Sequence, residues 1–368
     1  MDPKLAQMPS QTSDDLPAFT AGERVYDLNR VFQAVDFRGE LEPLRTLWQA
    51  SIWRAAQAEE QGLEIDDARL EGLAEEFRYA HDLVSAEECE QWLAARGLSV
   101  DDFSAFCVCK YWSQPDCAAA IRPAAPPDEI SALETDARQL RTCLILSDEF
   151  PSLARALAWR VALACENHLA TDNPAVARWR EHFLSAHALT EKDLPDWIAQ
   201  WGGAMEWFQE LAALEAQFAE ESQRLLTLNQ QQRALEPLRL HLLRLELEIL
   251  EFQSPAASRE AYLCAREERL TLAQLAEQID IPPRLATCYL EEVPEAWQTP
   301  LLSASPGEVL PAFNSEQGFQ VCRLVSKTNP SLADPVVLAR VNAAILRARF
   351  MDLEARHVRW HLNLEVEP

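Results

Sequence analysis

The first half of the chain carries a series of amphipathic helical patterns. From Leu44 to Ala55, apolar residues recur every three or four positions, and Gly62 follows as a suitable helix terminator. Capping residues mark three further helix starts. They are Asp66, the capping box of Ser85 and Glu88, and the pair Ser99 and Asp102. The pattern therefore predicts a compact unit of four helices.

The same pattern recurs about 106 residues further along the chain, with a one-residue deletion near its end. The matched positions are mostly aromatic, capping and histidine residues, and they keep a constant register. The pairs include Trp53 with Trp159, Asp66 with Asp172, Phe77 with Phe183, His81 with His187, and Trp92 with Trp197. We therefore predict an internal repeat, with a linker rich in proline and alanine between its copies.

The second half of the chain changes to a strand-like period. The segment LRLHLLRLELEILEF alternates apolar with charged residues, as a half-buried strand does. The predicted order is this strand over 238–252, helices over 257–266 and 270–279, a turn and helix within 281–300, strands over 305–313 and 318–327, and one long helix over 334–362. Together with the repeat, this order predicts an α+β protein that is predominantly α-helical.

These patterns divide the chain into six predicted segments. They are a disordered leader (1–22), a first helical unit (23–112), a linker (113–137), a second helical unit (138–235), a small α+β domain (236–330), and a C-terminal helix (331–368) that packs on the helical region. The sequence leaves open whether the two helical units share one core.

Charge and composition narrow the classes of partner. Lys and Arg total 33 and Asp and Glu total 59, so the formal net charge is −26, which disfavours nucleic acid and anionic membranes. Such a charge serves solubility or steers a basic partner peptide, and the sequence does not separate the two. No signal-like or membrane-spanning apolar run is found, and nine cysteines sit mostly in apolar helical patterns. A cytoplasmic protein without membrane insertion is expected.

The segment 246–328 resembles the parvulin family of peptidyl-prolyl isomerases. The matching motifs are, in order, ELEILEF, TLAQLAEQ, EVPEAW, SPGEVLPAF and GFQVCRLV. The last two are the most specific, because a Pro-Gly-Glu turn and a Gly-Phe-x-Val-x-x-Leu strand resemble the closing hairpin of that domain. The helical units look like the N-terminal region of SurA-type chaperones. The resemblance implies two tandem SurA-N-like units, a parvulin-like domain and a returning C-terminal helix.

The catalytic side chains of the parvulins are replaced here. The two histidines of that family correspond to Glu248 and Gln320, and its methionine and phenylalanine correspond to Glu292 and Ala296. The resemblance therefore implies a degenerate domain with no catalytic residues, cofactor or metal. If activity remained, Glu248, Cys288 and Gln320 would be its polar set.

The resemblance also implies a peptide-binding cleft. Its predicted lining is Leu250, Trp297, Phe313, Phe319 and Gln320. We expect chaperone-like binding of a polypeptide, accessory to the maturation or export of a ribosomally made peptide in a bacterial cytosol. A basic precursor would be the client, and a maturation enzyme or transporter would be a further partner. Two alternatives stay open: an active prolyl isomerase, and a non-enzymatic scaffold that joins other proteins.

Other side chains have ordinary explanations. His357 and His361 have helical i, i+4 spacing near Glu354, but no third strong metal ligand is evident, so packed or solvent-facing histidines are expected. The paired positions of His81 and His187 favour a shared structural role at a chain reversal. Cys107 and Cys109 are expected in the core. Three tryptophans near element ends are candidates for exposed peptide-gripping rings: Trp112, Trp201 and Trp297.

Overall fold

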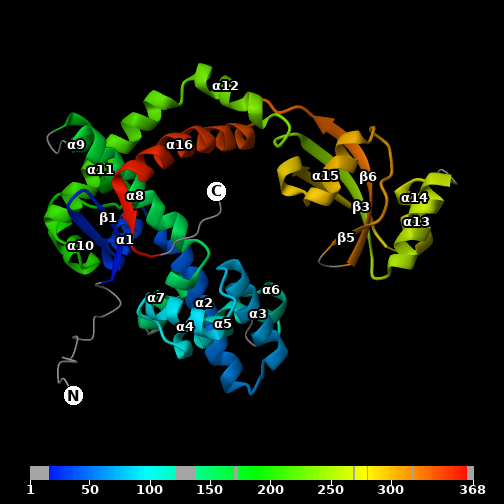
Figure 1. Cartoon of the computed structure of the whole chain (residues 1–368), viewed down its shortest axis with the longest axis horizontal. Coiled ribbons are helices and arrows are strands. Elements are labelled where there is room, and N and C mark those ends of the chain that lie inside the picture. Colours follow the sequence, from blue (N-terminus) through cyan, green and yellow to red (C-terminus); the bar gives the residue numbers. More distant parts are fainter. Residues whose placement is uncertain are drawn as a thin grey trace, which may run out of the picture. The chain divides into compact units, whose positions relative to one another are not determined.

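The computed structural model describes residues 16–121, 137–169, 173–267, 270–279, 281–315 and 318–362. The chain divides into two compact units (Figure 1). Unit 1 is Met1–Glu221 with Arg349–Pro368, and unit 2 is Ser222–Ala348. The predicted class, α+β and predominantly helical, is confirmed. No helix in these described ranges is long and apolar enough to cross a membrane.

Unit 1 contains both copies of the predicted repeat. The first copy is α2 (Leu41–Glu60), α3 (Asp67–Ala80), α4 (Ala86–Ala94) and α5 (Val100–Ser113). The second copy is α8 (Phe150–Asn167), α9 (Pro174–Ala186), α10 (Leu194–Trp201) and α11 (Met205–Leu225). Further helices are α1 (Leu28–Phe37), α6 (Pro115–Ala118) and α7 (Ala137–Leu146).

The predicted helix starts of the first copy are confirmed. Asp66 accepts a hydrogen bond from the first turn of α3. Ser85 Oγ accepts from the Glu88 backbone N–H at 3.1 Å, and the Glu88 carboxylate accepts from the Ser85 N–H at 2.9 Å. Ser99 and Asp102 form the same reciprocal pair at α5. Each box satisfies backbone donors that a helix start otherwise leaves unpaired.

The turns that end α3 and α9 show the repeat in detail. His81 and His187 each stack on the phenylalanine four residues earlier, with ring centroids 4.5 and 4.3 Å apart. The next residues, Asp82 and Ala188, both have positive φ, 51° and 52°. Both copies therefore reverse the chain through the same left-handed turn, which agrees with a structural role for the histidines. Asp172, the predicted counterpart of Asp66, lies outside the described residues.

One hydrophobic core joins the two copies. It contains Trp48 and Phe106 of the first copy and Phe208 of the second, and Phe37 of α1 stacks at 5.0 Å on Phe183. The two predicted helical units are therefore one compact body, which answers the question that the sequence left open. Within the predicted linker, residues 115–118 form α6, and residues 122–136 lie outside the described residues.

A small sheet in unit 1 corrects the prediction for both ends of the chain. It is antiparallel in the order β2-β1-β7, with β1 (Pro17–Ala21), β2 (Arg24–Asp27) and β7 (Val358–Trp360). The leader predicted over 1–22 is therefore wrong for the residues of β1. The final helix ends at His357 and does not continue to Leu362. These strands are short, and pairing of Phe19 with Trp360 is too distant in sequence for a local pattern to indicate.

Unit 2 is built on a four-stranded antiparallel sheet in the order β4-β3-β6-β5. Its elements are α12 (Leu228–Leu238), β3 (Arg244–Phe252), α13 (Pro255–Glu267), α14 (Leu272–Ile279), β4 (Arg284–Tyr289), the short 3₁₀ helix η3 (Leu290–Glu292), α15 (Glu295–Ser303), β5 (Phe313–Ser315), β6 (Gly318–Thr328) and α16 (Pro335–His357). Helices α13 and α14 cover one face of the sheet and α15 covers the other (Figure 1).

Three strand predictions in unit 2 need correction. The strand predicted over 238–252 begins only at Arg244, and Leu238 is the last residue of α12. The proline-rich passage predicted as turn and helix begins with the strand β4, because Arg284 to Tyr289 pair along β3. The strand predicted over 305–313 is instead a single bridge from Val309 to Arg323, and β5 starts only at Phe313. Backbone hydrogen bonds of Gly307, Glu308 and Leu310 still join this segment to β6, and the prolines at 306 and 311, which have no backbone donor, flank the paired residues.

Candidate functional site

The predicted peptide-binding residues lie on two faces of the unit 2 sheet. Leu250 belongs to the core under α13 and α14, and Phe319 packs against that core. Trp297 is in the core on the α15 face, where its ring lies 4.3 Å from that of Phe313. Gln320 follows Phe319 on the strand and so points to the α15 face. Among the described residues, these five side chains do not line one cleft.

The polar set expected of an active isomerase is also separated by the sheet. Glu248 lies on the α13 and α14 face, where Arg323 donates to its carboxylate at 2.7 Å. Cys288 packs on the α15 face, and burial raises the pKa of its thiol. Gln320 donates to Glu251 at 3.2 Å. A strand places alternate side chains on opposite faces, so Glu248 cannot act together with the other two.

The histidines of the C-terminal segment do not have the predicted helical spacing. α16 ends at His357, whose Nε2 lies 2.9 Å from Glu166, and the His361 backbone N–H donates to the Ala18 carbonyl in the small sheet. Glu354 accepts hydrogen bonds from two indole N–H groups instead. Within the described ranges, no group of three His, Cys, Asp or Glu side chains is placed to hold a metal.

The predicted gripping tryptophans are mostly packed inside. Trp112 and Trp297 are 4% and 8% exposed, and Trp201 is half-buried. Cys107 and Cys109 are buried, as expected for core residues, and burial raises the pKa of Cys107 to about 11. Trp112 also lines an open pocket of unit 1.

An apolar pocket of about 460 Å³ opens on unit 1 between α2 and α5. Its lining includes Ile52, Ala55 and Val108, which are half-buried, and Leu63, which is 36% exposed. Its one carboxylate is Glu59. We call this cavity the α2–α5 pocket. Covering these apolar side chains with another apolar group would lower the free energy by about 25 cal/mol for each Å² of apolar surface removed from water.

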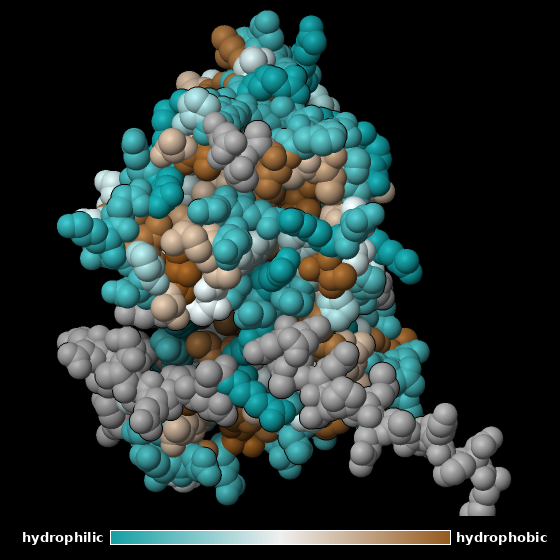
Figure 2. All heavy atoms as spheres, turned by 90° about the vertical axis from the view of Figure 1, so that its left-hand side faces the viewer, coloured by the Kyte–Doolittle hydropathy of each residue, from teal (hydrophilic) through white to brown (hydrophobic). Residues whose placement is uncertain are grey.

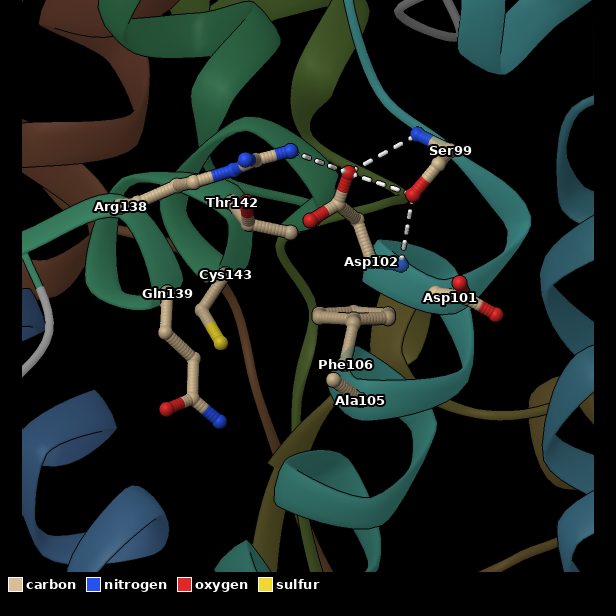
Figure 3. Close-up of a pocket in the computed structure, with 9 residues that line it drawn as sticks. All are labelled: Ser99, Asp101, Asp102, Ala105, Phe106, Arg138, Gln139, Thr142 and Cys143. Carbon is tan, nitrogen blue, oxygen red and sulfur yellow. Dashed lines mark hydrogen bonds and ion pairs between the residues drawn. The ribbon is translucent and has the colours of Figure 1, made fainter.

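A more polar pocket of about 390 Å³ adjoins it (Figure 3). Ala105 and Gln139 line both pockets. In the polar pocket, the Asp102 carboxylate accepts hydrogen bonds from Arg138 at 3.2 Å and from Ser99 Oγ at 2.7 Å. Burial opposes the charge of Asp102, but these hydrogen bonds outweigh it and hold the pKa of the carboxyl below its ordinary value. The two pockets together offer apolar contact beside fixed polar groups.

No pattern in the sequence indicates the α2–α5 pocket. Its residues belong to amphipathic stripes, and a stripe shows which side of a helix is apolar but not whether a neighbour covers that side. The nearest local signal is the run of small residues around Ala55 and Ala56 followed by Glu59. On the face shown in Figure 2, apolar side chains form separate patches between polar ones and no single broad surface.

Comparison with known proteins finds similar solved structures, but no family model or curated protein. No protein-family model matches the sequence, and no curated protein matches it significantly. Among solved structures, the chain is similar to the peptidylprolyl isomerase PrsA from Bacillus cereus, with 11% identity over 59% of this chain and 80% of that chain, at a TM-score of 0.36. It is similar to PrsA from Bacillus anthracis, with 8% identity over 59% of this chain and 100% of that chain, at a TM-score of 0.31.

A third similar structure comes from Campylobacter jejuni and is described as a SurA-like chaperone. Identity is 12% over 63% of this chain and 91% of that chain, at a TM-score of 0.22. The sequence predicted a resemblance to SurA-type chaperones and parvulin-type peptidyl-prolyl isomerases, and the descriptions of these similar structures agree with it.

Proposed function

We propose that this protein binds an extended polypeptide client and holds it without isomerising its prolines, as a chaperone does. The α2–α5 pocket is the observation that carries this proposal. It presents half-buried Ile52, Ala55 and Val108 to solvent. An open apolar cavity with a few polar groups at its edge is the usual form of a binding site.

The arrangement of unit 2 supports binding over catalysis. Rotation about a peptide bond has a barrier of about 18–20 kcal/mol, and lowering it requires polar groups that converge on one amide. Glu248 is separated from Cys288 and Gln320 by the sheet, and its charge is already paired with Arg323. The parvulin-like domain is therefore proposed to be degenerate.

The context of the proposal rests on the sequence. The net charge of −26 suits a basic client, since opposite charge speeds encounter and favours the correct partner. The resemblance to SurA-type proteins, together with nine cysteines that are all free thiols, leads us to propose a role in a bacterial cytoplasm. There the client would be a ribosomally made precursor that is handed to a maturation enzyme or a transporter.

Two measurements on the purified full chain test the proposal. The first follows light scattering of a chemically unfolded protein as it is diluted into buffer, and we expect the chain to suppress aggregation in proportion to its amount. The second follows a refolding reaction limited by proline isomerisation, and we expect its slow phase to keep its rate. Catalytic acceleration of that phase would establish the isomerase instead. No effect in either assay would contradict client binding and favour the scaffold alternative.

A further inference from the structure

The two copies of the repeat differ in what covers the same surface. The α2–α5 pocket lies on the first copy, and the repeat register pairs its Ala56 with Ala162 of the second copy. Ala56 is exposed, whereas Ala162 is completely buried. Val108 is half-buried, whereas its counterpart Ala213 is 1% exposed. The groove that is open in one copy is therefore closed in the other.

A β-hairpin of the chain itself lies against the corresponding surface of the second copy. β1 packs on α8, and a Cβ built on Gly22 at the hairpin turn would lie 3.9 Å from Cys165 Sγ. Arg24 of β2 forms an ion pair with Glu210 of α11. Cys165 and Glu210 correspond in the repeat to Glu59 and Ala105, and both of these line the α2–α5 pocket. The hairpin therefore occupies the position that the pocket leaves open in the first copy.

We propose that the α2–α5 pocket receives an extended segment of the client polypeptide, in the position that the β1–β2 hairpin takes on the second copy. This inference rests on the proposed function and assigns it a site. The segment over the second copy is Pro-Ala-Phe-Thr-Ala, whose Ala18 and Phe19 are completely buried. We therefore expect a client segment that has one large apolar residue among small ones, as β1 does.

Charge around the pocket selects the residues that flank the apolar segment. Cys165 of the second copy is replaced by Glu59, and the segment from the end of α2 to the start of α3 is strongly acidic. Its carboxylates are Glu59, Glu60, Glu64, Asp66 and Asp67. In the described part of the chain, none of these five forms an ion pair with Lys or Arg. A segment flanked by lysine or arginine would supply the missing positive charge.

Fluorescence anisotropy with labelled synthetic peptides tests this assignment on the full chain. The probe carries Pro-Ala-Phe-Thr-Ala with a lysine on each side. One comparison peptide replaces the phenylalanine by serine, and the other replaces both lysines by glutamates. We expect the serine peptide to bind about tenfold or more weakly, because burial of an aromatic ring is lost. We expect the glutamate peptide to bind more weakly still at low salt, where repulsion from the acidic loop is least screened.

Variants of the protein locate the site. Ala56→Trp fills the pocket from an exposed position, and we expect it to weaken binding of the lysine probe about tenfold. Glu59→Lys should weaken the same probe about two- to fivefold, as expected for exposed charges. Ala94→Trp and Glu90→Lys are matched controls on the exposed side of α4, outside both pockets, and should leave affinity unchanged. Circular dichroism of each variant confirms that it folds.

The outcomes separate this inference from the proposed function. Loss of probe binding in Ala56→Trp but not in Ala94→Trp supports the assigned site. If wild type and Ala56→Trp bind the probe and suppress aggregation equally, clients bind elsewhere and the site is wrong while the function stands. If wild type binds no probe but suppresses aggregation, the chemistry assigned to the client is wrong. If it does neither, the proposed function itself fails.

Discussion

The two copies of the helical repeat share a register and a turn geometry but differ in their surroundings. α8 of the second copy is packed under β1 and beside the end of α16, where Phe350 stacks on Trp159 at 5.6 Å. In the first copy, the matching helix α2 borders an open pocket. The same amphipathic stripe can therefore form part of the core in one copy and an open surface in the other. Neighbouring elements determine which, because burial of an apolar stripe is favourable whatever covers it.

The largest effect is expected from weakening the packing of the β1–β2 hairpin on the second copy. Phe19 of β1 is completely buried and lies 4.9 Å from Tyr26, ring to ring. Phe19→Ala should lower the free energy of unfolding by about 3–5 kcal/mol, because it leaves a cavity over α8. Urea denaturation measures this. Val25→Ala on the same hairpin, at a residue 52% exposed, should change it by less than about 1 kcal/mol.

A matched pair of substitutions tests the comparison at equivalent positions. Ala162→Asp should destabilise unit 1 by about 3 kcal/mol, because it places an unpaired charge where no solvent reaches. Ala56→Asp at the counterpart should lower stability by only about 0.5 kcal/mol, the difference in helix propensity. Both values come from the same urea titration. Equal effects would mean that the two surfaces are covered alike.

In the second cover, the end of α16 with β7, one carboxylate accepts several hydrogen bonds. Glu354 accepts hydrogen bonds from Trp159 Nε1 at 2.7 Å and Trp360 Nε1 at 2.8 Å, and pairs with Arg155 at 3.3 Å. Glu354→Leu should lower the free energy of unfolding by about 2 kcal/mol, because partly buried donors lose their acceptor. Asp352→Leu, at a more exposed carboxylate on the same helix, serves as the control and should change it by less than about 1 kcal/mol.

The smallest expected effect concerns pH at the turn of the first copy. Burial, and then the nearby charge of Arg96, lower the pKa of His81 below its ordinary value of 6.5. The unfolded chain therefore binds the proton more readily, so stability falls as pH drops through 6.5 and levels off below the folded pKa. His81→Phe should remove this part of the pH dependence. Thermal unfolding between pH 7.5 and 5 checks it, and an unchanged slope would show that other groups are responsible.

Local patterns in the sequence were sufficient for the helical part of the fold. The caps at Asp66, Ser85 and Ser99 are satisfied within a few residues, so local chemistry alone places those helix starts. The repeat predicted the paired turns at His81 and His187. The long strand β6 was also predicted, because its residues alternate and a turn sequence precedes it.

Local sequence patterns did not predict the candidate site. The predicted cleft assumed that Leu250 and Trp297 share a face, but the pairing of β3 with its neighbours puts them on opposite sides of the sheet. A shift of one position reverses every side chain of a strand, and motif resemblance does not specify that parity. The predicted helical spacing of His357 and His361 is wrong for a related reason, since α16 ends at His357 and the next residues form β7, which pairs with β1.

The helical class, the capped helix starts and the acidic charge could be predicted from the sequence, because each depends on residues within one or two turns or on composition. The repeat could be predicted because its two copies keep matching residues in one register. The structure was needed to show that both copies share one core, that the chain ends pair in a small sheet, and that a hairpin lies on one copy while a pocket stays open on the other. Those features depend on contacts between residues far apart in the chain, and a local sequence pattern does not specify which distant residues come into contact.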